Sequence, residues 1–519
     1  QQSPQQQPQQ QQPQLRSNQQ PQQQQQHQQT PAPETTVSET EIGNKHFELQ
    51  KIVGRGAFGV VWGAKERDGE EAAVKVVVAK DAAAFATATF EAELLQILTM
   101  ALHGKCREHV PRYIAHSASR KTGGTTSNSG GGTVHLAMSF CPGGALDKWL
   151  YGISDEEHKT VEVVQLVDGH LPGGQQGSWY LVNAAIVVRG LLTQLSGVFA
   201  ALEPIAYHRD VSSHNVLMNL PDGDVPGANP TFALIDFGLA VRSGSWNKEW
   251  RSSNLAGDPR YWTPSAWMAF AFGFKYVATH PNHGFQQQYL TRMDHFSLGV
   301  LGLETLFALW HTGEAYEGKA PGLLEVRAAW CKYWVAVIHL FQMFHRHGAQ
   351  EVRQYLAHSQ DEGITGLVNN LRQLRQSLRA AALHAQNGQY ASVLLVLADL
   401  IDERGSADWA EIPSMLGEDH TRSEAEACVP TQLPGNESAR TSMALIDPLP
   451  SMSLSTHRRI RSTGGVLDQE RKRFEPEVGQ QRQQYMTTVV SGASPISAGV
   501  AVDPLSRSFS HARHVSGYV

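Results

Sequence analysis

Apolar residues are dense and regularly spaced only between about Lys45 and Arg404, and their spacing changes within that stretch. The first part has short runs of β-branched and apolar residues. These runs predict strands at 46–53, 60–64, 72–79 and 134–140. Helical spacing appears at 88–102 and then dominates, at 182–202, 294–310, 324–344 and 366–385. Strands followed by helices predict one α+β unit made of two parts.

The two ends of the chain have compositions that cannot form a core. Residues 1–30 contain 19 Gln and 4 Pro, so residues 1–44 are expected to be a disordered Gln/Pro-rich arm. Residues 405–519 are rich in Ser, Arg and Gln and are expected to form a disordered tail. Either extension is a candidate segment for binding a partner. Within the folded unit, polar surface insertions are expected near 117–133, 152–178 and 221–230.

The charge balance argues against a nucleic-acid-binding surface. The 43 Lys and Arg against 49 Asp and Glu give a formal net charge of −6, which offers no general attraction for nucleic acid. No apolar run approaches the roughly 18 residues of a membrane-spanning helix, so none is expected. The cysteines have neither metal-ligand nor disulfide-framework spacing, which favours a reducing location, cytoplasmic or nuclear. They are Cys106, Cys141, Cys331 and Cys428.

Three glycines, Gly54, Gly56 and Gly59, form a GxGxxG pattern in GRGAFGVV. Glycines at this spacing let backbone amides approach phosphate oxygens closely, although the pattern alone is weak evidence. A dinucleotide-binding fold requires a helix directly afterwards. Here the run from Val60 to Trp62 continues as a strand, so the pattern predicts a nucleotide-binding hairpin instead.

A lysine, Lys75, lies inside the apolar run AAVKVV, which predicts a buried strand. A buried charge requires a partner, and the next helix offers Glu91 and Glu93. Glu91 is the better candidate because leucines follow it at i+3, i+4 and i+7, which places it on the packed face of that helix.

Two polar motifs follow the helix predicted at 182–202. YHRDVSSHNVLM contains HRDxxxxN, with Asp210 and Asn215 five positions apart, and LIDFGLA places Asp236 after a short apolar run. Each motif could arise by chance. The glycine pattern, the buried lysine, the helix glutamate and these two motifs in this order make coincidence negligible.

Over residues 45–404 the sequence therefore resembles the eukaryotic protein kinase superfamily. The resemblance implies a bilobal fold. Its small lobe, about 45–140, would hold a five-stranded antiparallel sheet and one helix, and its large lobe, about 141–404, would be mainly helical. MSFCPGGALDKWL resembles the hinge between lobes, GDPRYWTPS resembles the end of the activation segment, and DHFSLGV resembles the start of the central large-lobe helix, with Asp294 as its anchor.

The resemblance also implies roles for the motif residues. Lys75 would contact the α and β phosphates of ATP and pair with Glu91. Asn215 and Asp236 would hold Mg²⁺ or Mn²⁺, and Asp210 would accept the proton of the substrate hydroxyl. The remaining nucleotide contacts that it implies are Val53, Gly54, Gly56, Phe58, Gly59, Val61, Ala73, Met138, Phe140, Cys141 and Leu217.

The sequence departs from the family pattern near the catalytic motif. Ser212 stands where serine/threonine kinases carry a lysine that touches the γ-phosphate, and losing such a charge costs about 10² to 10³ in rate. A protonated His214 would be a substitute cation. Asp258 replaces the usual threonine, and Ser265 replaces the glutamate of the APE motif. The long spacing from Pro264 to the central helix predicts a further insertion near 266–290.

Two functions follow from these observations. The first is a Mg²⁺-dependent protein kinase that phosphorylates protein hydroxyls, with serine or threonine favoured by family abundance alone. The second is a pseudokinase scaffold or allosteric partner, suggested by the departures. The enzyme is favoured because a scaffold needs neither the base nor both metal-ligating residues. The resemblance implies that Arg209 receives an activation-segment phosphate, and the candidate phosphosites are Ser243, Ser245, Ser252 and Ser253.

Overall fold

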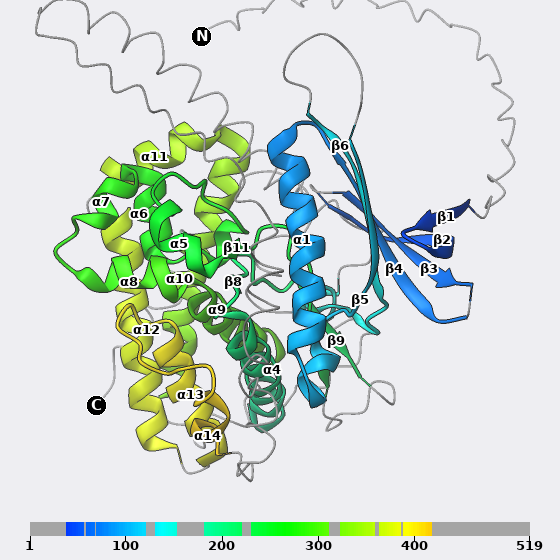
Figure 1. Ribbon diagram of the computed structural model, residues 1–519. Coiled ribbons are helices and arrows are strands. Elements are labelled where there is room, and N and C mark those ends of the chain that lie inside the picture. The colour runs from blue at the N-terminus through cyan, green and yellow to red at the C-terminus, as the bar shows by residue number, and fades with distance from the viewer. Residues whose placement is uncertain are drawn as a thin grey trace, which may run out of the picture.

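The chain is mixed α+β, with an antiparallel sheet in its first part and helices in its second (Figure 1). The computed structural model describes residues 38–56, 59–67, 69–120, 130–152, 181–220, 230–310, 322–358, 363–385 and 388–417. The Gln-rich residues before 38, most of the tail, and the insertions expected at 152–178 and 221–230 lie almost entirely outside this part of the chain. The α+β class predicted from the sequence is therefore confirmed.

The sheet has six strands, one more than the five that the resemblance implied. All neighbouring strands are antiparallel, in the order β1-β2-β3-β4-β6-β5. The strands are β1 (Ser38–Ile42), β2 (Lys45–Gly56), β3 (Gly59–Glu66), β4 (Glu71–Ala79), β5 (Tyr113–Arg120) and β6 (Gly132–Ser139).

The extra strand, β1, comes from the stretch assigned to the Gln-rich arm. It pairs with β2, and its last residue, Ile42, is fully buried beside Phe47. Burial of this isoleucine, together with pairing to β2 along the whole strand, offsets the entropy of ordering a polar segment. At the other edge, β5 and β6 extend into the insertion expected at 117–133, and residues 121–129 of that insertion lie outside the described part of the chain.

One helix, α1 (Ala82–Ala101), packs along the sheet, on the side that faces the helical part (Figure 1). It begins earlier than the spacing predicted because the Asp81 side chain accepts a hydrogen bond from the backbone N–H of Ala84 and caps the first turn. Its leucines Leu94, Leu95 and Leu98 are buried, as the spacing predicted.

The second part is built on two buried helices, α4 and α9, which contact each other and α13. Its first elements are β7 (Gly144–Ala145), α2 (Leu146–Tyr151), α4 (Leu181–Leu202), β8 (Ala206–Tyr207), β9 (Val216–Asn219), β10 (Thr231–Leu234), β11 (Val241–Arg242) and α5 (Ser243–Glu249). After these come α6 (Pro264–Phe272), α7 (Phe274–Ala278), α8 (His283–Thr291), α9 (Met293–Leu309), α10 (Leu323–His347), α11 (Ala349–His358), α12 (Ile364–His384), α13 (Gly388–Leu400) and α14 (Ile412–Met415). The stretch expected as an insertion at 266–290 is thus largely helical.

Of the described helices, α4 alone is long and apolar enough to cross a bilayer. Most of its apolar residues are buried against α9, α13, α14 and β10. Its position is that of a core helix.

The fold continues past the boundary expected at residue 404. Trp409 is 3% exposed and stacks on Phe199 of α4 and on His295 of α9. Asp399 accepts hydrogen bonds from the backbone N–H groups of Ser406 and Ala407 and so fixes the turn that leads to it. Apolar burial therefore anchors the segment after α13 to the core.

We expect Trp409→Ala to lower the free energy of unfolding by about 3–5 kcal/mol, because it removes a large side chain from between two aromatic rings. Urea denaturation monitored by circular dichroism measures the change. Leu383→Ala is the control, since Leu383 is 84% exposed and its loss should change stability by less than about 0.5 kcal/mol. Equal stability of the two variants would contradict the anchoring role.

Candidate active site

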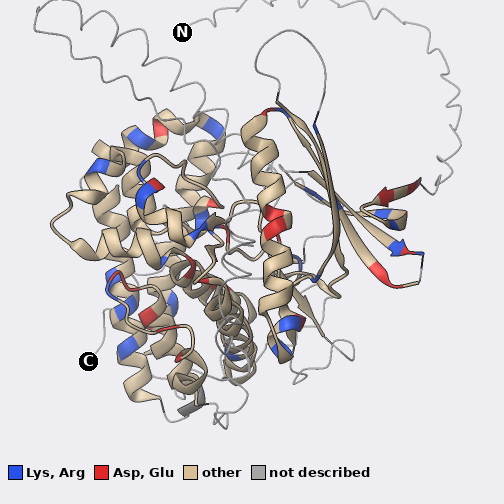
Figure 2. Cartoon of the chain, viewed as in Figure 1, with Lys and Arg blue, Asp and Glu red and all other residues tan. Residues whose placement is uncertain are grey.

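Lys75 joins the sheet, α1 and the segment after β10 through two short ion pairs. Its Nζ donates to Glu91 Oε1 at 2.6 Å and to Asp236 Oδ1 at 2.7 Å. Lys75 and Glu91 are both buried, whereas about a third of the Asp236 side chain is exposed. Glu91 is thus the partner of Lys75, and the acidic residues lie about halfway along α1 (Figure 2).

The charges around Lys75 fix its protonation state. Burial alone would lower the pKa of Lys75, but the negative charges of Asp236 and Glu91 outweigh burial and hold this pKa above its ordinary value. Asp236 shows the reciprocal effect: burial opposes ionisation, yet the Lys75 charge holds the pKa of Asp236 below its ordinary value. The lysine is charged and locked in position.

Glu93, the alternative partner considered for Lys75, contacts Arg242. Its Oε2 accepts from Arg242 at 3.2 Å, and the Arg242 guanidinium also lies over the ring of Phe90. The two glutamates of α1 thus contact different segments, one on β4 and one on β11.

Asp210 and Asn215 form one hydrogen-bonded unit. Asn215 Nδ2 donates to Asp210 Oδ2 at 2.8 Å, and the backbone N–H of Asp258 donates to Asp210 Oδ1 at 2.9 Å. The backbone N–H of Ile235, which precedes Asp236, donates to the carbonyl oxygen of Asn215. The structure therefore brings Asp210, Asn215 and Asp236 together, as the motifs predicted.

Asp294, at the start of α9, anchors the loop that contains His208, Arg209 and Asp210. Its two carboxylate oxygens accept the backbone N–H groups of His208 and Arg209, both at 2.8 Å. Arg209 and Asp236 are the two described non-glycine residues with positive φ, at 68° and 62°. Such backbone strain persists only where the surrounding contacts enforce it, and it is typical of functional sites.

Burial sets the ionisation of Asp210. It raises the pKa of Asp210 to about 7, against the lowering effect of the Asp258 backbone N–H. A carboxylate with a pKa near neutrality is suited to take up a proton during a reaction. His208, which is fully buried beside Phe237, has its pKa lowered to about 4 by burial and is neutral.

The glycine pattern lies at the end of the β2–β3 hairpin, where Gly56 pairs with Gly59. A Cβ at Gly59, whose φ is +155°, would lie 2.3 Å from the carbonyl oxygen of Val76, so only glycine fits against β4 there. Gly54 pairs with Val61. Phe58, predicted to contact the nucleotide, lies outside the described residues.

The other predicted nucleotide contacts lie on neighbouring strands and on the connection between the two parts. Ala73 of β4 pairs directly with Met138 of β6, and Leu217 of β9 pairs with Ala145 of β7. Val53 and Phe140 are each more than a third exposed. Burial raises the pKa of Cys141 to about 11, so this thiol is not a reactive thiolate.

The predicted metal ligands have suitable oxygen atoms. Among the described residues, none donates a hydrogen bond to Asp236 Oδ2 or Asn215 Oδ1, because Lys75 and Gly238 use the other Asp236 oxygen and Asn215 binds Asp210 through its nitrogen. Hard carboxylate and amide oxygens are the ligands that Mg²⁺ prefers. In the same part of the chain no three His, Cys, Asp or Glu side chains form a cluster that would hold a metal alone. These two residues therefore fit an ion that takes its other ligands from phosphate and water.

The sequence departures form contacts of their own. Ser212 is buried, and Asp258 pairs with Arg260 through both carboxylate oxygens, with Nε at 2.9 Å from Oδ2. His214 Nδ1 lies 3.2 Å from Asp147 Oδ2, and this hydrogen bond raises the pKa of His214. Arg260, whose side chain is 13% exposed, and the half-exposed His214 are thus each paired with an acidic side chain.

A buried hydrogen-bond network around Glu304, which reaches the loop at Ser213, was not predicted. Glu304 of α9 accepts hydrogen bonds from the hydroxyl groups of Tyr151 and Tyr261, and the Tyr261 hydroxyl also contacts Ser213 Oγ at 2.8 Å. Burial raises the pKa of Glu304 to about 7. Its partners lie 43 to 153 residues away in sequence, so no local pattern indicated them.

The candidate phosphosites lie on or directly after α5. Ser252 and Ser253 each donate to the carbonyl oxygen of Glu249, Ser245 donates to the Glu249 side chain, and Ser243 donates to the Pro204 carbonyl. Arg209, predicted to receive a phosphate, donates to the Asn254 carbonyl at 2.6 Å and lies over the ring of Trp246.

Comparison of the sequence with protein-family models finds no match, and comparison with curated proteins finds none either.

Proposed function

We propose that this protein is a divergent protein kinase, with the sheet and α1 as the small lobe and the helical part as the large lobe. The observation that carries the proposal is that the buried Lys75 pairs with both Glu91 and Asp236, while Asp236 adjoins the Asp210–Asn215 unit. A lysine cation, a base and two oxygen ligands for a metal ion are the groups that γ-phosphoryl transfer requires.

Each residue has a distinct task in this proposal. Lys75 binds the α and β phosphates of ATP, and Glu91 orients it. Asp210, oriented by Asn215 and the Asp258 N–H, accepts the proton of a protein hydroxyl as that oxygen attacks the γ-phosphorus and ADP leaves. Mg²⁺ or Mn²⁺ held by Asn215 and Asp236 would neutralise the phosphate oxygens. Serine or threonine is the favoured acceptor by analogy with the family.

Labelled ATP tests the proposal. We expect purified protein with Mg²⁺ to transfer the γ-phosphate to itself or to a generic protein acceptor, and excess EDTA to abolish transfer, because the hard oxygen ligands cannot neutralise the triphosphate without the cation. Adding Mg²⁺ back should restore activity. Nucleotide binding without any transfer would overturn the enzyme and favour the scaffold, which the replacements at Ser212 and Asp258 suggest.

A further inference from the structure

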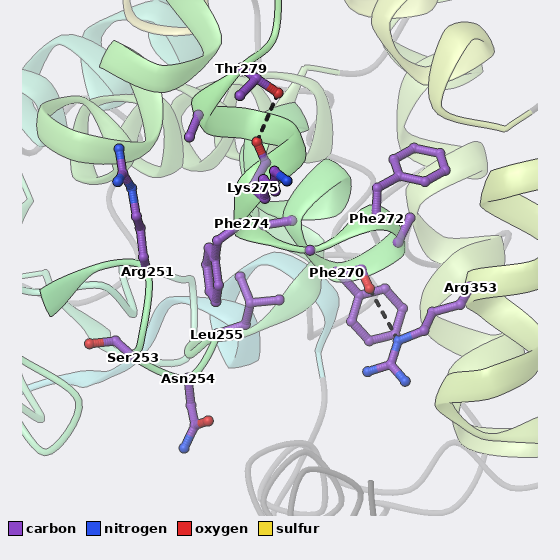
Figure 3. Close-up of a pocket in the computed structure, with 14 residues that line it drawn as sticks. Arg251, Ser253, Asn254, Leu255, Phe270, Phe272, Phe274, Lys275, Thr279 and Arg353 are labelled. Atoms are coloured by element: carbon purple, nitrogen blue, oxygen red, sulfur yellow. Dashed lines mark hydrogen bonds between the residues drawn. The ribbon is translucent and has the colours of Figure 1, made fainter. Parts of the chain in front are cut away.

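A cavity of about 830 Å³ lies beside α6, α7 and α11, next to the chain that follows α5 (Figure 3). Its volume is within the range of about 300–1,000 Å³ that is usual for ligand sites. Most of its lining residues lie between Ala269 and Thr279, in the stretch whose sequence indicated an insertion, and none belongs to the Lys75–Asp210 site. We call this feature the α6–α7 cavity.

The α6–α7 cavity has an apolar surface. Phe270 and Phe272 line it from α6, Phe274 lines it from α7, and Leu255 lines it from the chain after α5. Phe272 is 39% exposed, and its ring centre lies 4.6 Å from that of Tyr276, which is also exposed. An aromatic side chain that bound there would cover exposed rings and bury its own apolar surface.

The cations of the cavity are spread out. Figure 3 shows Arg251 and Arg353 on opposite sides of Phe274 and Leu255, and Lys275 is the third cation of the lining. Arg251 and Lys275 are exposed and form no ion pair with any described residue. None of the lining residues, all of which the structure describes, is Asp or Glu. The cavity therefore suits a ligand that carries separate acidic groups around an apolar group, rather than one compact anion.

Aromatic rings position both arginines. The Arg353 guanidinium lies 4.7 Å from the centre of the Phe270 ring, and its Nε donates to the Phe270 carbonyl at 3.1 Å. The Arg251 guanidinium lies 5.1 Å from the ring centre of Trp250. Stacking of this kind reduces the entropy that each arginine loses when it pairs with a carboxylate.

The cavity lies close to the proposed base. The backbone carbonyl of Asn254, on the cavity wall, accepts a hydrogen bond from Arg209, which directly precedes Asp210. Asp258, three residues after Leu255, donates its backbone N–H to Asp210. Three residues span at most about 11 Å, so a peptide held in the cavity can present a hydroxyl to Asp210 from a position several residues away.

We propose that the α6–α7 cavity binds a docking segment of the protein substrate, in which acidic residues flank an aromatic residue. The inference rests on the proposed function and names its substrate class. The aromatic side chain packs on the phenylalanine rings, and the acidic residues on its two sides pair with Arg251 and Arg353 separately. Because the docking segment binds away from the reacting atoms, it should lower KM without changing kcat.

Peptide binding tests the proposal without ATP or metal. The probe is a fluorescein-labelled peptide with two glutamates on each side of a phenylalanine, in flanks of Gly and Ser. Two matched probes replace the phenylalanine with serine, or all four glutamates with glutamine. We expect fluorescence anisotropy to show that each replacement weakens binding at least about fivefold, because the first removes apolar burial and the second removes the carboxylates.

Charge reversal assigns the binding to the cavity. A further probe carries lysine in place of the four glutamates. Arg251→Glu should lower the preference for the glutamate probe over the lysine probe by at least about tenfold, because a carboxylate then faces the peptide. Lys332→Glu, which reverses an exposed cation of α10, gives the same net charge and should keep the preference.

Phe272→Ala tests the apolar contact. It should weaken binding of the phenylalanine probe and leave that of the serine probe unchanged. Arg251 and Phe272 are both exposed, so thermal unfolding should change little in either variant. Equal binding of all the probes, or the same preference in Arg251→Glu as in Lys332→Glu, would overturn the proposal. A dimer that Arg251→Glu dissociates, with no peptide binding, would assign the cavity to a second copy of the chain instead.

Kinetics separate this inference from the proposed function. The acceptor is a serine peptide joined through a Gly/Ser spacer of about six residues, at most about 20 Å long, to the glutamate–phenylalanine segment or to its glutamine version. We expect the first acceptor to have a KM about fivefold lower at equal kcat, and Arg251→Glu to remove this difference. Segment binding without any phosphate transfer would overturn the kinase assignment and keep the docking site. Transfer with the same kcat/KM for both acceptors would keep the kinase and overturn the docking site.

Discussion

Asp210→Asn strongly lowers phosphoryl transfer and leaves ATP binding intact; this is the result we expect if Asp210 is the base of the proposed kinase. Asparagine has the shape of aspartate, and its Oδ1 can still accept the Asp258 backbone N–H, whereas its Nδ2 cannot accept from Asn215. Asn215 keeps its hydrogen bond to the backbone carbonyl of residue 210, so the loop should keep its conformation. An amide cannot take up the proton of the attacking hydroxyl. Loss of general-base catalysis lowers the rate by about 10² to 10⁴, which label transfer from ATP measures directly.

The control for this variant is Asp408→Asn, which removes an exposed carboxylate from the segment after α13. It should leave transfer unchanged. Full activity of Asp210→Asn, with correct folding confirmed by circular dichroism, would show that Asp210 is not the base.

Lys75→Met should remove transfer, weaken ATP binding and destabilise the fold. Lys75→Met leaves two carboxyl groups, Glu91 and Asp236, without their cation, and burial already raises the pKa of Glu91 to about 7. The variant must therefore bury an unpaired carboxylate or take up a proton, and we expect a cost of up to about 3–5 kcal/mol. Urea denaturation measures the loss of stability, and binding of a fluorescent ATP analogue measures the loss of affinity.

The double variant Lys75→Met/Glu91→Gln separates these two effects. Neutralising Glu91 removes the buried unpaired charge, so much of the stability should return. Transfer should stay absent because no cation meets the phosphates. Recovery of transfer in the double variant would place the nucleotide phosphates elsewhere.

The long helices were predicted within a few residues because packing repeats along their whole length. The predicted 324–344 became Leu323–His347, and 366–385 became Ile364–His384. β1 was missed because its burial depends on one isoleucine at the end of a polar segment. The helices between Pro264 and α9 were missed because that stretch was judged by its length against the family pattern rather than by its own spacing.

The candidate site could be predicted from the sequence wherever a charged residue lies within an apolar segment. A lysine in an apolar strand requires an acid, and the helical spacing selected Glu91 over Glu93, which the structure bears out through the contact at 2.6 Å. The Asp258–Arg260 pair and the Glu304 network could not be predicted in this way. Polar residues are common in loops, so their presence there indicates no particular partner. Their partners are determined by tertiary packing alone.

Asp258 makes one contact through its backbone and another through its side chain, and the two have different consequences. Its amide steadies the base, while its carboxylate is occupied by the neighbouring arginine. In the kinase that we propose, a protease cut or a bulky adduct just upstream of Asp258 would therefore lower turnover while the helices stay folded. Loss of turnover and loss of structure would then be separate events, with turnover lost first.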